Sequence, residues 1–457
     1  MAATAEQIAE ERPLGKQVRD ALLARTPRSQ ALNREGSQVL AVEVVPTFEM
    51  RHPIYIESTG GARVTDVDGN SYIDLTMGMG PHLLGHRPDC VVDALRAQID
   101  QNIHVSLHNP LQSKLARLVE DACRCAEQVV FSNSGTEATM YGMRVARGFT
   151  GKPKVASFSG SYHGAHDYAL IKDNSESPPS DPTGKNYGRG VPDVIKDDTM
   201  MVLPYRDERA FDLIREHAHE LAVVMIEPVQ SSNPRTDIKE FLHGLNDVCR
   251  ECGVLFMFDE VITGFRMAYG GAQEYFDITP DLATYGKALG GGMAIGALAG
   301  QADVMEMLSK GWGHPDGVFS GGTFSGNPMT MAAGIAAVEY MRDHQEILYP
   351  HLNEQGERLA REINRFCEEH QIPVQLMNAG SMFHFHFQRG AIERARDISD
   401  EHHAAENDFY LHVLGRDVIV PPLHVFFISE AHSAADVDTI IETFKDSLLD
   451  VRADRLI

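Results

Sequence analysis

Basic residues are scarce relative to acidic ones in this 457-residue chain. It has 41 Lys and Arg against 65 Asp and Glu, which gives a formal net charge of −24. Nucleic acids and anionic membranes attract basic surfaces, so this charge argues against both as partners. An acidic surface favours cationic substrates only weakly, because it commonly serves solubility.

Long apolar runs are also lacking, since no segment approaches the length that spans a bilayer. The first twenty residues, MAATAEQIAEERPLGKQVRD, carry mixed charges and no apolar core of the kind found in a secretory signal. We therefore expect a cytoplasmic protein that meets neither a membrane nor a nucleic acid.

Cysteine is sparse, with six residues in the whole chain. Cys123 and Cys125 form a CxC, and Cys249 and Cys252 form a CxxC within a helical pattern. A zinc site needs a second pair of ligands at matching spacing, and the sequence offers none that is convincing. Free thiols of a reducing compartment are expected instead, with no metal site.

The chain has enough apolar material, 43% of its residues, for one large α/β unit and a smaller companion. Strand and helix patterns alternate from Gln128 to Gln301, which predicts a mostly parallel sheet covered by helices. The segment His52–Leu75 is typical of a small antiparallel meander. The expected division is an N-terminal segment 1–75 belonging to the small domain, a large domain 76–330, and an α+β C-terminal small domain 331–457.

The stretch from Val254 to Gly292 carries the most informative pair of residues. The apolar run VLFMF predicts a buried strand, and it ends in Asp259. Lys287 lies 28 residues further on (287 − 259) and precedes three glycines. An amine and a carboxylate at neighbouring strand ends suit a lysine that holds an aldehyde as a Schiff base and an acid that keeps a pyridine nitrogen protonated. Taken alone, the two residues are better explained by an ordinary ion pair.

Three other predicted strands also end in polar groups. Ser134-Gly135-Thr136 stands at the start of a long helix, where it is either a phosphate site or a plain helix cap. Tyr162 follows another strand and can cover a flat heterocycle or belong to the core. Glu227 ends a third. The carboxyl ends of parallel strands line one crevice. Together these groups predict a pyridoxal 5′-phosphate site.

Two features lie outside this set. The segment Asn174–Asp193 is rich in Pro, Gly and Ser, and we predict a long loop that covers the active site. His384 and His386 share one face of a predicted strand, and a solvent-facing pair is expected there rather than metal ligands.

The motifs SNSGTEATMYGMRVARGFTG, SYHGAHD, IEPVQ, FDEVITGFR, TPDLATYGKALGGG and GGTFSGNP resemble those of class III, fold type I pyridoxal-phosphate aminotransferases. The resemblance runs from about His52 to the C-terminus and points to the subgroup that includes glutamate-1-semialdehyde 2,1-aminomutase. It implies that Lys287 is the Schiff-base lysine and proton shuttle, and that Asp259 holds the pyridinium nitrogen. It implies that Glu227 steers the half-reactions or positions substrate. The cofactor-binding set that it implies is Ser134, Gly135, Thr136, Tyr162, His163, Gln230, Asp259, Val261, Lys287 and Thr323. Thr323 would come from the neighbouring subunit of a homodimer with shared sites.

Two departures from the aminomutase pattern favour an aminotransferase. Aminomutases carry an arginine in a Ser-Pro-Val-Arg motif where this chain has Glu43 or Val44, neither of which can hold a carboxylate as an arginine does. They also carry a glutamate where His424 stands. We therefore expect amino transfer from a small donor to an aldehyde or ketone. Candidates for the donor carboxylate are Arg235, Arg266 and Arg389. The aminomutase, a racemase, epimerase or decarboxylase on the same scaffold, and a non-catalytic dimer remain as alternatives.

Overall fold

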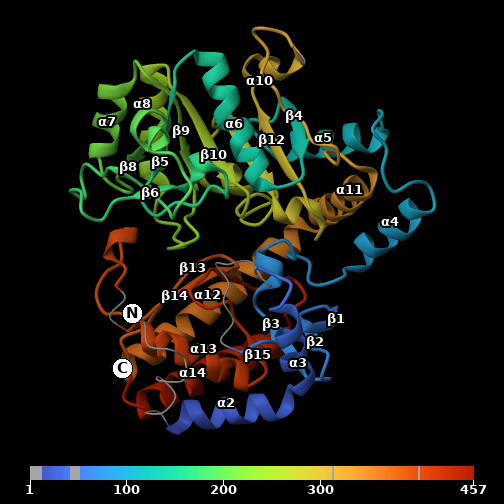
Figure 1. The fold of residues 1–457 in the computed structure, drawn as a ribbon, viewed down its shortest axis with the longest axis vertical. Helices are drawn as coiled ribbons and strands as arrows, with labels where there is room; N and C mark the ends of the chain where they lie inside the picture. Colours follow the sequence, from blue (N-terminus) through green and yellow to red (C-terminus); the bar gives the residue numbers. More distant parts are fainter. Residues whose placement is uncertain (1–12, 42–51, 311–312, 400–401) are drawn as a thin grey trace. The chain divides into compact units, whose positions relative to one another are not determined.

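The structure is a computed structural model that describes residues 13–41, 52–310, 313–399 and 402–457. The chain forms two compact units (Figure 1). Unit 1 comprises residues 1–88, 350–391 and 398–457, and unit 2 comprises residues 89–349 and 392–397.

These boundaries differ from those expected at 75/76 and 330/331. Residues 331–349 belong to unit 2, where helix α11 (Pro328–Asp343) packs on α4 (Asp89–Ile99) and α5 (Pro110–Ala122). Residues 76–88 belong to unit 1, because His86 bridges to Gly61 and its ring lies 2.8 Å from the carboxylate of Asp74.

Unit 2 is built on a seven-stranded sheet, drawn from teal at β4 to gold at β12 (Figure 1). Its order is β4-β12-β11-β10-β9-β5-β8. The strands are β4 (Gln128–Ser132), β5 (Lys154–Phe158), β8 (Met200–Leu203), β9 (Leu221–Ile226), β10 (Leu255–Glu260), β11 (Leu282–Gly286) and β12 (Gly296–Gly300). Strand β12 pairs antiparallel with both of its neighbours, and the other pairs are parallel. The predicted mostly parallel sheet is thus confirmed.

Apolar sequence explains why β9 lies inside this sheet, between β10 and β5. Its six residues, LAVVMI, are all buried, as expected for a strand with covered faces and paired edges. Helix α6 (Gly135–Thr150) packs across β12, β11 and β9, and α8 (Lys239–Cys252) packs on β10. The remaining helices of unit 2 are α7 (Arg209–His217), α9 (Gly271–Phe276) and α10 (Ala302–Ser309).

The segment predicted as a long loop, Asn174–Asp193, contains the second strand of a hairpin whose first strand ends at Asp173. Strands β6 (Ile171–Asp173) and β7 (Gly184–Asn186) pair antiparallel, with Lys172 opposite Lys185. The sequence pattern missed these strands because each has only three residues.

Unit 1 contains two small sheets and five helices among its described residues. One sheet has the order β1-β2-β3-β15, from β1 (Ile56–Gly60), β2 (Arg63–Asp66), β3 (Ser71–Asp74) and β15 (Val418–Ile419). The first three strands form the predicted antiparallel meander. The other sheet is β13 (Gln375–Ala379), β14 (Met382–His386) and β16 (Phe426–Phe427). The helices are α2 (Pro13–Arg25), α3 (Pro27–Gly36), α12 (Gln345–Glu369), which crosses the unit boundary, α13 (His403–Gly415) and α14 (Ala434–Ala453).

The prediction of a solvent-facing pair at His384 and His386 is wrong. Their rings stack with centroids 4.7 Å apart, and His386 is only 3% exposed. Burial lowers the pKa of His384 to about 4 and that of His386 to about 3, so both rings are neutral at pH 7. The alternation of the sequence puts both histidines on one face of β14, but it does not show whether other residues cover that face.

Within the described part of the chain, no helix combines the length and apolarity needed to cross a bilayer.

Candidate active site

The carboxyl ends of β10 and β11 bring Asp259 and Lys287 to the same edge of the sheet. The two strands are parallel, with Asp259 opposite Thr284 and Glu260 opposite Tyr285. Lys287 follows the last residue of β11 and begins the short turn η4 (Lys287–Gly290) with a φ of 43°, a region that residues other than glycine seldom occupy. The predicted adjacency of the two strand ends is therefore present.

Three donors hold the carboxylate of Asp259, which is 5% exposed. Its Oδ2 lies 2.7 Å from Nδ1 of His163. Its Oδ1 accepts hydrogen bonds from Thr284 Oγ1 at 3.2 Å and from the Val261 N–H at 3.1 Å. These three hydrogen bonds fix the orientation of the carboxylate. The far nitrogen of the histidine, Nε2, is buried and has no hydrogen-bond partner among the described residues.

The turn Ser134-Gly135-Thr136 opens helix α6. The Ser134 hydroxyl accepts from the Glu137 N–H at 3.2 Å, and the Glu137 carboxylate accepts from the Asn133 N–H at 2.6 Å. The helix is thus capped by its own side chains, while its first N–H groups point out of the helix start, an arrangement that suits a phosphate.

Gly135 is required by its surroundings. A Cβ at this position would lie 2.7 Å from Cγ1 of Val261, closer than carbon atoms can approach. A Cβ on Gly286 would lie 3.3 Å from the same methyl group. The phosphate-type turn, the residue after β10 and the residue before Lys287 therefore meet at one place.

The turn after β5 carries Tyr162 and is tied to Glu227. The carboxylate of Glu227 accepts from the Tyr162 N–H at 2.6 Å and from the Ser231 N–H at 3.0 Å. Burial raises the pKa of Glu227, although His163 opposes that shift. One oxygen of Glu227 thus holds the turn after β5, and the other holds the turn after β9.

The same turn lies against the start of α6. Thr136 Oγ1 accepts from the Ala165 N–H at 3.3 Å, and a Cβ on Gly164, whose φ is 103°, would lie 2.7 Å from that oxygen. Gln230 donates from Nε2 to the Ser159 carbonyl at 2.9 Å, and its buried Oε1 has no hydrogen-bond partner in the described part of the chain. The structure thus brings the predicted residues of four strand ends together.

The pKa of Lys287 is lowered to about 8, chiefly by burial and next by the charge of Arg266, whereas Glu227 and Asp259 oppose the shift. Arg266 is 2% exposed, and burial lowers its own pKa to about 9. An amine with a pKa near 8 is partly neutral at physiological pH, as a nucleophile must be.

The other two arginines considered for a donor carboxylate have different roles. Arg235 pairs with Asp237, at 2.5 Å between Nη2 and Oδ2, and with Glu393 at 3.4 Å. Arg389 belongs to unit 1 and donates to the Gln371 carbonyl at 2.7 Å. Of the three, Arg266 is the one that acts on the pKa of Lys287.

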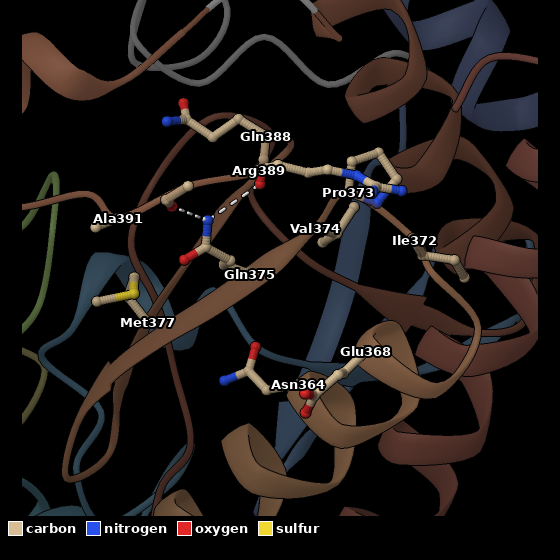
Figure 2. Close-up of a pocket in the computed structure, with 11 residues that line it drawn as sticks. Asn364, Glu368, Ile372, Pro373, Val374, Gln375, Met377, Gln388, Arg389 and Ala391 are labelled. Carbon is tan, nitrogen blue, oxygen red and sulfur yellow. Dashed lines mark hydrogen bonds between the residues drawn. The ribbon is translucent and has the colours of Figure 1, made fainter.

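Arg389 also lines a pocket of about 450 Å³ in unit 1, between α12, β13 and the 388–391 segment (Figure 2). Gln375 crosses it and donates to the carbonyls of Gln388 at 3.0 Å and Gly390 at 2.8 Å. Arg389 is the one predicted site residue that lines this pocket.

Thr323 is exposed in the single chain, and His424 has its Nδ1 2.9 Å from the Val425 carbonyl oxygen. Glu43 and Val44, at the position of the aminomutase arginine, lie outside the described residues.

Sequence reasoning missed a strap formed by residues 392–397, which belong to unit 2 although the chain on both sides belongs to unit 1. Arg396 of the strap pairs with Asp173 and donates to the Asn174 carbonyl at 3.0 Å. Asp173 also accepts from the Ser159 hydroxyl at 2.5 Å. Arg396 and Asp173 are more than 200 residues apart in the sequence, and neither a motif nor a periodic pattern predicts a contact between them.

The residues fit pyridoxal 5′-phosphate. The start of α6 offers N–H groups for a phosphate, and Val261 and the half-exposed ring of Tyr162 are apolar surfaces for a flat heterocycle. Asp259 is a carboxylate for a ring nitrogen, and the buried Oε1 of Gln230 still has capacity for a hydrogen bond. Lys287 offers an amine at the end of β11.

Comparison with known proteins agrees with this geometry. Residues 45–445 match the family model described as aminotransferase class-III. Glutamate-1-semialdehyde 2,1-aminomutase of Methanocaldococcus jannaschii is 36% identical over 400 residues, which cover 86% of this chain and 91% of the relative. The solved structure of an omega-transaminase from Sphaerobacter thermophilus is 29% identical, with a TM-score of 0.87 over 94% of this chain and 99% of that one. A β-phenylalanine aminotransferase from Variovorax paradoxus is also 29% identical, with a TM-score of 0.83 over 96% and 97% of the two chains.

Proposed function

Because this chain belongs to the class III aminotransferases, which are pyridoxal 5′-phosphate enzymes of fold type I, we propose that it moves an amino group from an amino donor to the aldehyde or ketone of a small metabolite by a ping-pong mechanism. The observation that carries the proposal is the placement of Asp259 and Lys287 at adjacent ends of β10 and β11, beside the turn that opens α6.

The side chains divide the work. When bound, the cofactor supplies an electron sink for the carbon that bears the amino group. Lys287 binds the cofactor and, when released, moves a proton between the reacting carbons. Asp259 keeps a proton on the ring nitrogen, and His163 keeps Asp259 in place at 2.7 Å. Gly135 and Thr136 bind the phosphate, Val261 and Tyr162 cover the ring, and Gln230 meets the ring oxygen.

Glu227 is proposed as a positioning group. Both of its oxygens accept backbone N–H groups, at 2.6 and 3.0 Å, so its part in the reaction is to hold the turns that carry Tyr162 and Gln230. Arg266 is the residue proposed to bind the donor carboxylate, because its charge is near enough to Lys287 to lower the pKa of that amine.

The departures at residues 43–44 and 424 favour transfer over isomerisation. A histidine at 424 and Glu43 or Val44 replace the two charged groups that mark the aminomutase motif. Two transaminase structures, each 29% identical to this chain, show that amino transfer occurs on a scaffold of this kind.

Isomerisation of glutamate 1-semialdehyde is the second candidate, because the 36% identical relative is named an aminomutase. The deciding experiment gives the enzyme glutamate or alanine with a panel of carbonyl acceptors, and separately gives it glutamate 1-semialdehyde alone. Amino transfer to an acceptor supports the proposal. Isomerisation without any transfer would establish the aminomutase instead.

We also propose a homodimer in which Thr323 reaches the partner's phosphate site. Thr323 is exposed, and large apolar side chains around it are exposed as well: Ile103 by 62%, Leu107 by 80%, Phe319 by 52% and Phe324 by 59%. The ring of Phe324 lies 5.1 Å from that of His104, so these two segments form one surface, which a second copy would cover.

The six cysteines are all free, which fits a reducing compartment and the proposed cytoplasmic location.

A further inference from the structure

Lys172, in the middle of strand β6, is a second amine beside the active site. Its Nζ donates to the Ser161 carbonyl at 2.6 Å and lies 5.2 Å from the centre of the Tyr162 ring. Burial lowers the pKa of Lys172 to about 8, and Glu227 opposes the shift, so the amine is mostly charged at pH 7.

We infer that Lys172 is a positioning residue for Tyr162, whose ring it holds ready to stack on the cofactor. The inference rests on the proposed function, in which Tyr162 covers the cofactor ring.

The ring of Tyr162 needs such a support. Its backbone is fixed by the hydrogen bond from its N–H to Glu227, but 51% of the residue is exposed, so the side chain has room for more than one rotamer. An ammonium over one face of an aromatic ring attracts the ring and restricts it. The opposite face then stays available to a ligand, and less freedom is lost when the ligand binds.

Strand β6 is itself held firmly enough to serve as the support. Asp173, next to Lys172, accepts from the Ser159 hydroxyl at 2.5 Å and pairs with Arg396 of the strap. Lys172 and Asp173 of β6 thus both hydrogen-bond to the turn that leads into Tyr162. Lys172 contacts Ser161, and Asp173 contacts Ser159.

The test measures binding to the apoenzyme of pyridoxine 5′-phosphate, which has an alcohol in place of the aldehyde and so cannot react with Lys287. Lys172→Met removes the charge and keeps most of the length. Lys185→Met is the matched control, because Lys185 is the cross-strand neighbour of Lys172 and is exposed. Lys172→Arg keeps the charge. Isothermal titration calorimetry gives the dissociation constant of each.

We expect Lys172→Met to weaken binding by about threefold to tenfold, the range of a cation–π contact and an ordered side chain. Lys185→Met should match the wild type, and Lys172→Arg should recover most of the loss. In a Tyr162→Leu background, Lys172→Met should cause no further loss, because the effect of Lys172 passes through the ring. Should Lys172→Met fail to fold, Lys172→Gln supplies the same comparison.

Wild-type affinity in Lys172→Met, or an equal loss in the Tyr162→Leu background, would overturn the inference and leave the proposed site standing. Wild-type affinity in Tyr162→Leu alone is a different failure, since it would remove Tyr162 from the proposed site.

Discussion

Gly135 and Val261 pack against each other where three features meet. These are the turn that opens α6, the end of β10, and Lys287 at the end of β11. The space is filled so closely that a single added carbon on Gly135 would stand 2.7 Å from a methyl group of Val261. The choice of glycine there is therefore a matter of packing as well as of the proposed phosphate binding.

Gly135→Ala should weaken cofactor binding by about tenfold or more, because overpacking of this kind costs about 1–3 kcal/mol and the helix start must move. Absorbance titration of the apoenzyme with pyridoxal 5′-phosphate measures the loss. Val261→Ala in the same protein makes room for the new methyl group and should restore part of the affinity. No recovery in the double variant would show that the close contact is not the cause.

The rate at which the apoenzyme reacts with the aldehyde of the cofactor (the capture rate) should depend on pH through the pKa of Lys287, which is lowered to about 8. The neutral amine is the reactive form, and at pH 7 it is roughly a tenth of the total with a pKa near 8 but less than about a thousandth with an unperturbed value near 10.5. Stopped-flow capture rates should rise with pH and level off above about pH 8. A rate that keeps rising through pH 10 would contradict the account.

Arg266→Met should raise the pKa of Lys287, because the arginine's charge lowers it. In this variant the plot of capture rate against pH should move to higher pH. An unchanged plot would show that the charge of Arg266 does not affect the pKa of Lys287.

At the scale of elements, the strap 392–397 joins the loops of the site to a distant part of the chain. Arg396 and Asp173 are 16% and 11% exposed, whereas the neighbouring pair Arg394 and Asp207 is 36% and 20% exposed, with 3.0 Å between the charged groups. Arg394 and Arg396 are thus two residues apart in the sequence, but the ion pair of Arg396 is more deeply buried than that of Arg394.

Arg396→Met should destabilise the protein by about 2–3 kcal/mol, because it leaves a buried carboxylate without its cation. Arg394→Met is the control and should cost less than about 1 kcal/mol, as expected of a surface pair. Urea unfolding measures both, and hydrogen exchange should quicken around Ser159 and Asn174 only in Arg396→Met. Equal effects of the two substitutions would count against a role of the strap.

Much of this architecture is readable in the sequence. The runs VLFMF and LAVVMI have to be buried strands, and turn residues after them mark the ends where Asp259 and Glu227 stand. Contacts between distant segments are not readable. Arg396 contacts Asp173, and Lys172 contacts Tyr162, only through the tertiary fold. The neutral state of His384 and His386 likewise depends on their burial by the tertiary fold.

At the scale of the whole molecule, the exposed apolar surface around Thr323 is the feature that a single chain leaves unexplained. Side chains as large as Leu107 and Phe324 are 80% and 59% exposed there. Such a surface is typical of an interface between subunits.

Leu107→Asp should therefore convert the protein to monomers and weaken cofactor binding, because Thr323 would no longer reach the partner's phosphate site. Leu449→Asp on α14, at a leucine that is 40% exposed, is the matched control and should leave the assembly unchanged. Sedimentation velocity with and without cofactor measures the mass of the assembly, and absorbance titration of the apoenzyme measures its affinity for the cofactor. A Leu107→Asp protein with the wild-type mass and affinity would refute the proposed interface.

The central claim is that Lys287 is the amine that binds the cofactor aldehyde. Borohydride reduction of the holoenzyme, followed by digestion and mass spectrometry, locates the covalent link directly. The account predicts the reduced adduct on Lys287 alone. An adduct on Lys172, the other amine near the site with a pKa of about 8, or no adduct at all, would contradict it.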